Sequence, residues 1–265
     1  MLMMTHTWLL RNFLRDERLI AENLELFVYN ICPDLLPLHR DITAADTHGI
    51  ARCATLPPEH RKNAFVHFHL VVDDLSHHGM ITAEPVREFN PDSNGYTYLK
   101  GKPLVQPLQD IYARQGTPIA REQAAYRSHM IIEMTFDLAM HLAQIAEGER
   151  MISLLCDAMQ FTVAERLNEF CNNISWLYGF PPDVVRETMI EGAAFYHRDR
   201  IRRFMTMEGR INLFAGKFGI ARDDMNALEM LRQVMNMGME LVRDYEDFLE
   251  PTLTEIRRAG FNPAY

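Results

Sequence analysis

The stretch from Tyr126 to Ala146 constrains the fold most, because it is long, apolar and without a helix breaker before Gly148. Its pattern predicts a helix of about five turns. Side chains four residues apart lie on one face of a helix, so four ionisable residues form a single stripe: His129, Glu133, Asp137 and His141. Such groups on an apolar helix are costly unless they are paired or bind a metal. We interpret the stripe as one wall of a metal site; a satisfied buried polar network is the alternative.

The histidines are concentrated in the first half of the chain. Ten of the 11 precede residue 142, and His197 alone follows. Generic packing roles would not require this segregation. We therefore expect residues 1–148 to hold the chemistry and residues 149–265 to support them, within one helical domain spanning 1–265.

A second histidine-rich helix is predicted from Arg61 to Met80. One face of this helix carries His69, Asp73 and His77 at four-residue spacing. A neighbouring stripe carries His67, Asp74 and His78. Only one stripe can point straight into a shared site. We favour the first, and the second remains a competitor.

Three further ligand-type residues lie near the start of the chain. His6 falls in the first turn of a helical segment, 5–29, for which Thr5 is a plausible N-cap. Asp34 follows Pro33, and with Pro37 this proline predicts a helix break. His48 comes fourteen residues after Asp34. A simple N-cap role is the alternative reading of Asp34.

The remaining segments are predicted from their breakers and periodicity. Residues 90–107 favour an extended loop or a hairpin around Asn94-Gly95, able to act as a rim or lid. Thr117 is expected to cap the central helix, with Pro118 at its first position. The second half is predicted to form helices, with a break at Pro251: 149–177, 184–207, 210–216 and 223–249.

Taken in order, the candidate ligands form one mixed set of imidazoles and carboxylates: His6, Asp34, His48, His69, Asp73, His77 or His78, His129 and Glu133. This set is large enough for two or three divalent metal ions with positions left for water. Zinc is the first choice for such nitrogen and oxygen ligands. Manganese, iron and nickel are alternatives.

The same residues resemble the zinc-dependent phospholipase C and single-strand nuclease superfamily, whose members are all-helical, multi-metal phosphoesterases. The resemblance covers roughly residues 5–141. It rests on an early His, on an Asp and a His fourteen residues apart, on HxxxD at His69 and Asp73, and on HxxxE at His129 and Glu133. It implies an all-α, phospholipase C-like domain with a helical C-terminal extension, acting as a phosphodiesterase on a small phosphoester substrate.

General metal-hydrolase chemistry then suggests roles for individual residues. Asp34 or Asp74 is expected to position the attacking water or to accept its proton. Arg127 is a candidate for stabilising charge on the phosphoester oxygens. The side chains expected to support the ligands without binding the metal are His67, Asp137 and His141.

Composition limits the other possibilities. A net charge of −9 argues against a general nucleic-acid surface, and no apolar run approaches the roughly 20 residues of a membrane span. The first residues lack the features of a signal peptide. The four cysteines, Cys32, Cys53, Cys156 and Cys171, have no CxxC spacing, which suits reduced thiols in the cytoplasm.

Competing readings remain. A non-catalytic helical protein could use the same residues in a structural metal site or a buried polar network. An HD-type phosphohydrolase is a second alternative, but it requires a His-Asp dipeptide, which the sequence lacks. The methionines of the C-terminal segment fit core packing, and a homodimer through these helices is left open.

Overall fold

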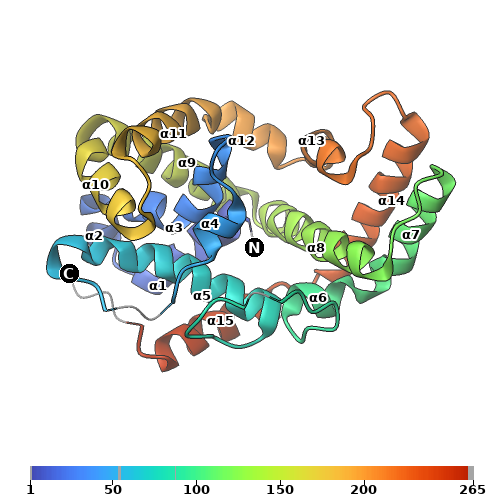
Figure 1. Ribbon diagram of the computed structural model, residues 1–265, viewed down its shortest axis with the longest axis horizontal. Helices are drawn as coiled ribbons and strands as arrows, with labels where there is room; N and C mark the ends of the chain where they lie inside the picture. Colours follow the sequence, from blue (N-terminus) through green and yellow to red (C-terminus); the bar gives the residue numbers. More distant parts are fainter. Residues whose placement is uncertain (1, 53–54, 87, 262–265) are drawn as a thin grey trace.

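The structure, a computed structural model, describes residues 2–52, 55–86 and 88–261, and these form helices without any strand (Figure 1). The all-α prediction is confirmed. The α-helices are α1 (Met3–Leu14), α2 (Glu17–Glu22), α3 (Leu26–Leu35), α4 (Ala44–His48), α5 (Ala64–His78), α6 (Tyr96–Gly101), α7 (Val105–Arg114), α8 (Arg121–Ala143), α9 (Ile145–Phe161), α10 (Leu167–Tyr178), α11 (Pro182–Phe195), α12 (Arg198–Phe204), α13 (Met207–Phe214), α14 (Met225–Leu241) and α15 (Glu246–Arg258). Short 3₁₀ or π segments adjoin them: η1 (Leu36–Leu38), η2 (Pro58–Asn63), η3 (Lys102–Leu104), η4 (Thr162–Arg166) and η5 (Ala215–Phe218).

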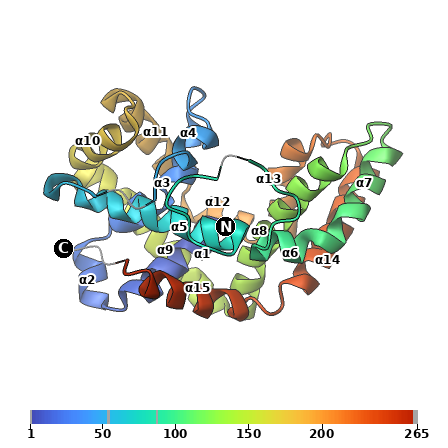
Figure 2. The ribbon, with the colours of Figure 1, turned by 60° about the horizontal axis from the view of Figure 1, so that its bottom comes forward.

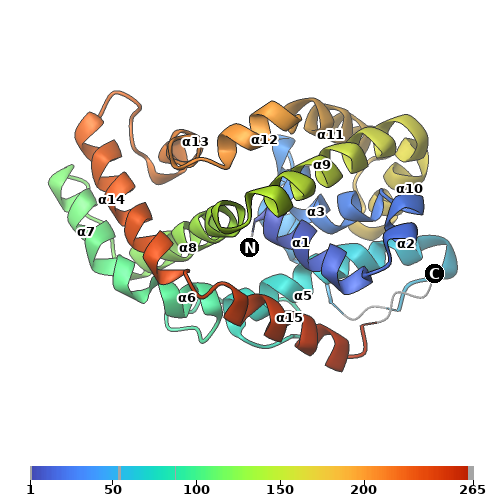
Figure 3. The same cartoon turned by 180° about the vertical axis from the view of Figure 1, so that it is seen from behind.

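Helix α8 connects the two ends of an elongated molecule. At one end α8 packs against α6, α7 and α14, and its other end meets α9 (Figures 1 and 3). The last helix, α15, returns to pack against α1 and α5 (Figure 2). The C-terminal half of the chain therefore covers both ends of the N-terminal half. Among the described residues, no helix is long and apolar enough to cross a membrane.

Helix α3 forms the centre of the core on the α1 side of the molecule. Every residue of α3 is buried except Asp34, whose side chain is partly exposed at the last turn. The helix packs against α1, α5 and α9. Burial of its large apolar side chains stabilises the fold by about 1.5–3 kcal/mol each. This packing fixes the position of Asp34 at the helix end.

Of the three prolines expected to break helices, Pro37 lies just after the end of α3, in η1, and the other two lie inside helices. Pro33 is within α3 and Pro251 is within α15, so the predicted breaks are wrong at both positions. A proline inside a helix removes one backbone hydrogen bond and costs about 3 kcal/mol. Around Pro251 the neighbouring Phe248, Leu249 and Leu253 are buried, and their burial exceeds that cost.

Two predicted helix starts also differ from the structure. Thr5 lies within the first turn of α1, whose N-cap is Leu2. Helix α8 begins at Arg121, after Ala120 in an extended conformation, and does not start at Pro118. Of the cysteines, Cys53 lies outside the described residues, and the others are free thiols.

The segment predicted as a loop or hairpin, 90–107, is largely helical instead. It contains α6, η3 and the start of α7. Gly95 caps α6 and approaches the end of α5 so closely that a Cβ atom there would lie 2.1 Å from the carbonyl carbon of His77. The hydroxyl of Thr97 donates to the carbonyl of Ser76 at 3.0 Å. The turn-forming residues thus allow close packing on the helix end that carries His77.

Substitution of Gly95 tests this contact. Gly95→Ala should lower the free energy of unfolding by about 1–3 kcal/mol, because the backbone at His77 must move to admit the methyl group. Gly216→Ala is the matched control, since no atom of the described residues lies within 4 Å of a Cβ at that glycine. Urea unfolding of both variants measures the difference. Equal stability of the two would contradict the close approach.

Candidate metal centre

Eight of the predicted ligands converge in three groups. Within each group, one ligand atom from every residue lies within 4.8 Å of the others. The groups draw on five helices: α1, α3, α4, α5 and α8. They are His6, His69 and Asp73; Asp34, His48 and His69; and His77, His129 and Glu133.

The carboxylate of Asp73, a member of the first group, also lies close to the two histidines of the second. Its Oδ1 lies 3.3 Å from Nε2 of His6. Its Oδ2 lies 3.4 Å from Nε2 of His48 and 3.3 Å from Nε2 of His69. The rings of His6 and His69 stack with their centroids 3.7 Å apart. One carboxylate therefore faces three imidazoles that come from three helices.

Helix α4 is tied to the end of α3, which places His48 beside Asp34. The hydroxyl of Thr47 donates to the carbonyl of Pro33 at 2.8 Å. Nδ1 of His48 lies 2.9 Å from the carbonyl oxygen of Ala44. A carbonyl can only accept, so Nδ1 carries a proton. Burial opposes the charged ring, yet the carboxylates of Asp73 and Asp34 raise the pKa of His48, so a cation bound at Nε2 would take the place of a proton there. That Nε2 atom is the one facing Asp34, at 3.8 Å.

The third group lies one turn further along α5. Nε2 of His77 is 2.7 Å from Oε1 of Glu133 on α8. The ring of His129 lies edge-on to His77 at 5.3 Å and stacks on Tyr98 at 4.7 Å. His77 is four residues after Asp73, and four residues of α-helix rise about 6 Å. The third group therefore adjoins the first and second groups, which meet at Asp73.

The protonation states suit cation binding. Burial lowers the pKa of His69 to about 4 and the pKa of His129 to about 3, so both rings are neutral at pH 7. Burial opposes ionisation of Asp73 and Glu133, yet the pKa of each carboxyl lies below its usual range; hydrogen bonds from His48 and His6 to Asp73, and from His77 to Glu133, are among the causes. Neutral imidazole and ionised carboxylate are the forms that bind metals.

The hydrogen bonding of His69 also favours a bound divalent cation. His69 is fully buried, and within residues 2–52, 55–86 and 88–261 neither of its ring nitrogens makes a hydrogen bond of good geometry. A buried polar atom left without a hydrogen bond costs about 1–3 kcal/mol. A cation accepting the Nε2 lone pair beside Asp73 would remove that cost.

Three of the candidate ligands reach solvent in part. The side chains of His48, Asp34 and His77 are 27%, 27% and 25% exposed, while those of His6 and His69 are fully buried. The second and third groups therefore each have a partly exposed member.

Of the two stripes of α5, only one contributes residues to the three groups. His69, Asp73 and His77 all belong to the three groups, and His67, Asp74 and His78 belong to none of them. Asp74 is buried and ion-paired with Arg52 at 3.1 Å. It also accepts hydrogen bonds from the backbone N–H and the hydroxyl of Thr82, at 3.0 and 2.7 Å. Its two oxygens are thus held by other groups.

The four stripe residues of α8 differ in role: His129 and Glu133 belong to the third group, whereas Asp137 and His141 belong to none of the groups. Asp137 accepts hydrogen bonds from the backbone N–H groups of Met4 and Thr5, at 3.3 and 3.0 Å. It therefore caps the N-terminus of α1, the helix that carries His6. Buried Arg210 pairs with the same carboxylate at 3.2 Å. Asp137 positions the helix of a candidate ligand and lies in none of the three groups.

The other residues expected to support the site lie elsewhere. His141 packs against Gly148, and the guanidinium of Arg127 lies 4.5 Å from the centre of the Tyr112 ring. Sequence reasoning did not find Arg52 or Arg210. A buried Asp in an apolar helix is costly without a partner, so a partner for Asp74 and for Asp137 could have been predicted. The sequence spacing does not indicate which arginine fills that role.

Comparison of the chain with models of protein families, with curated proteins and with solved structures gave no match.

The buried pair of Arg210 and Asp137 gives a stability prediction. Arg210→Met should lower the free energy of unfolding by about 3–5 kcal/mol, because it leaves the Asp137 carboxylate buried without its partner. The double variant Arg210→Met/Asp137→Asn should lose less, since no charge then remains unpaired. Thermal or urea unfolding measures both.

The surface pair of Arg202 and Glu149, in which the Arg202 side chain is half exposed, supplies the control. Arg202→Met should cost about 0–1 kcal/mol. If Arg210→Met costs no more than this control, the capping role of the pair is wrong.

Proposed function

We propose that the chain is a metal-dependent hydrolase that acts on phosphoesters and binds two or three divalent cations in the three donor groups. The observation that carries the proposal is the convergence of eight side chains from five helices. These residues are widely spaced in the sequence, and they are the ones that the resemblance to the phospholipase C and nuclease superfamily assigns as ligands. A chance polar network would not require this correspondence.

Each group is a candidate site for one cation. The group of His77, His129 and Glu133 shares no residue with the others. The group of His6, His69 and Asp73 and the group of Asp34, His48 and His69 share His69, whose neutral ring has one free lone pair and can bind a cation in only one of them at a time. Zinc suits such mixed nitrogen and oxygen ligands, and manganese, iron and nickel are alternatives.

When bound, divalent cations lower the pKa of a coordinated water towards 7 and neutralise charge on the phosphoester oxygens. The Asp34 carboxylate is partly exposed, so it can orient a water or accept its proton. The bonds from Arg52 and Thr82 to Asp74 favour Asp34 over Asp74 for this role.

A purely structural metal site is less well supported. Structural zinc sites close with four protein ligands, whereas catalytic sites keep three ligands and an open position. Each group here offers three protein ligands, and two of the groups have an exposed member. This arrangement favours catalysis.

Metal content and turnover test the proposal together. The purified protein should contain more than one transition metal ion per chain and should hydrolyse bis(p-nitrophenyl) phosphate. His69→Ala and Glu133→Ala should each remove metal, because His69 belongs to two of the groups and Glu133 to the other. Both variants should lose at least about 100-fold in turnover. Elemental analysis and a colorimetric assay measure these quantities.

The exposed His197, which lies outside the three groups, provides the control variant His197→Ala, which should keep its metal and its activity. Turnover that is unchanged in both His69→Ala and Glu133→Ala would contradict the proposal. Protein that retains its ions but hydrolyses no phosphoester would favour the structural alternative.

A further inference from the structure

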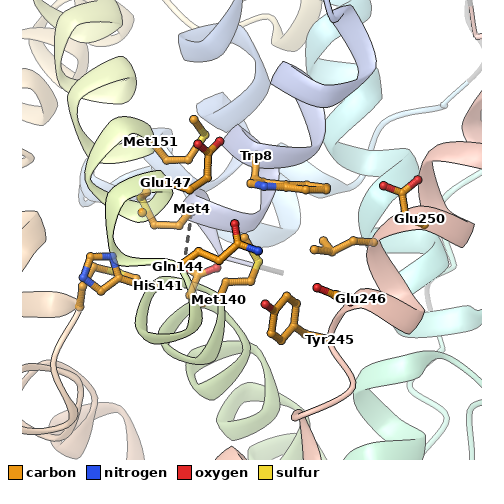
Figure 4. A pocket seen from close by; sticks show the side chains of 14 residues that line it. Met4, Trp8, Met140, His141, Gln144, Glu147, Met151, Tyr245, Glu246 and Glu250 are labelled. Carbon is orange, nitrogen blue, oxygen red and sulfur yellow. Dashed lines mark hydrogen bonds between the residues drawn. The ribbon is translucent and has the colours of Figure 1, made fainter.

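A cavity of about 310 Å³ lies apart from the metal groups, and none of their eight residues lines it. It is bounded by the start of α1, the junction of α8 and α9, and the start of α15 (Figure 4). Its size is at the lower end of the range for small-molecule sites. Asp137 and His141, the two α8 stripe residues outside the metal groups, line this cavity.

The apolar part of the lining is aromatic and polarisable. Trp8 and Tyr245 face the cavity from α1 and from the residue before α15 (Figure 4). Methionine thioethers complete this surface: Met4, Met140, Met151 and Met205. Aromatic faces attract cations through their quadrupole, and most strongly when the cation is weakly hydrated.

The charge of the lining has one sign. Four carboxylates line the cavity, and no Lys or Arg does so among the described residues. Arg210 neutralises Asp137 at 3.2 Å, and Arg11 pairs with Glu147 at 2.7 Å. Burial lowers the pKa of His141, so its ring adds no positive charge at pH 7.

The other two carboxylates of the lining belong to α15. Glu246 and Glu250 are one turn apart on α15, and both are exposed. Within the part of the chain that the structure describes, neither forms an ion pair. Figure 4 shows both of them on the side of the cavity that Trp8 and Tyr245 also line.

We propose that this cavity binds a small organic cation, whose ammonium group lies between the rings of Trp8 and Tyr245 and the carboxylates of Glu246 and Glu250. An anion would meet the two unpaired carboxylates. A neutral apolar molecule would gain the ring and thioether contacts without the electrostatic attraction. An ammonium ion with apolar substituents uses both parts of the lining.

Tryptophan fluorescence tests the proposal, because the chain has only two tryptophans. In a Trp176→Phe background, which leaves Trp8 as the reporter, benzyltrimethylammonium chloride should produce a saturable change in emission. Benzyl alcohol, which has the ring without the charge, and potassium chloride at equal ionic strength should not. Glu246→Gln/Glu250→Gln should weaken binding by about tenfold.

The matched control is Glu187→Gln/Glu191→Gln, which removes two exposed carboxylates at the same spacing on α11 and should bind as the parent does. A melting curve confirms that each variant is folded. An equal response to benzyl alcohol, unchanged affinity in Glu246→Gln/Glu250→Gln, or no saturable change at all would each overturn the proposal. Metal content and phosphodiesterase activity play no part in this outcome.

Discussion

The contact of one carboxylate with three imidazoles is the constraint on which the rest of the structure depends. Asp73 faces His6, His48 and His69 in a buried setting. Groups of this kind are stable inside a protein only if each is paired or bound to a cation. The fold must therefore bring α1, α4 and α5 to one point and hold them there.

Several separate devices in the chain maintain this convergence. Thr47 ties α4 to the carbonyl of Pro33, and Asp137 caps α1 with the support of Arg210. Gly95 allows the start of α6 to pack directly against the backbone of His77 at the end of α5. Arg210 belongs to the C-terminal half, so the half that lacks candidate ligands still determines where His6 lies.

Much of the centre could be predicted because helical periodicity is a local property. The four-residue spacing of His69, Asp73 and His77 fixes their common face whatever surrounds the helix. The choice between this stripe and that of Asp74 depended on Arg52, which is remote in sequence from α5 and could not be read from spacing. The helical path through Pro33 was missed because tertiary burial outweighed a local preference against helix.

The most direct test of the central claim is anomalous diffraction from crystals of the purified protein, measured at the absorption edge of the metal that it contains. We expect anomalous peaks within coordination distance of Asp73 and His69 and of Glu133 and His77. Direct hydrogen bonds between these carboxylates and imidazoles, with no anomalous peak at either place, would contradict the account.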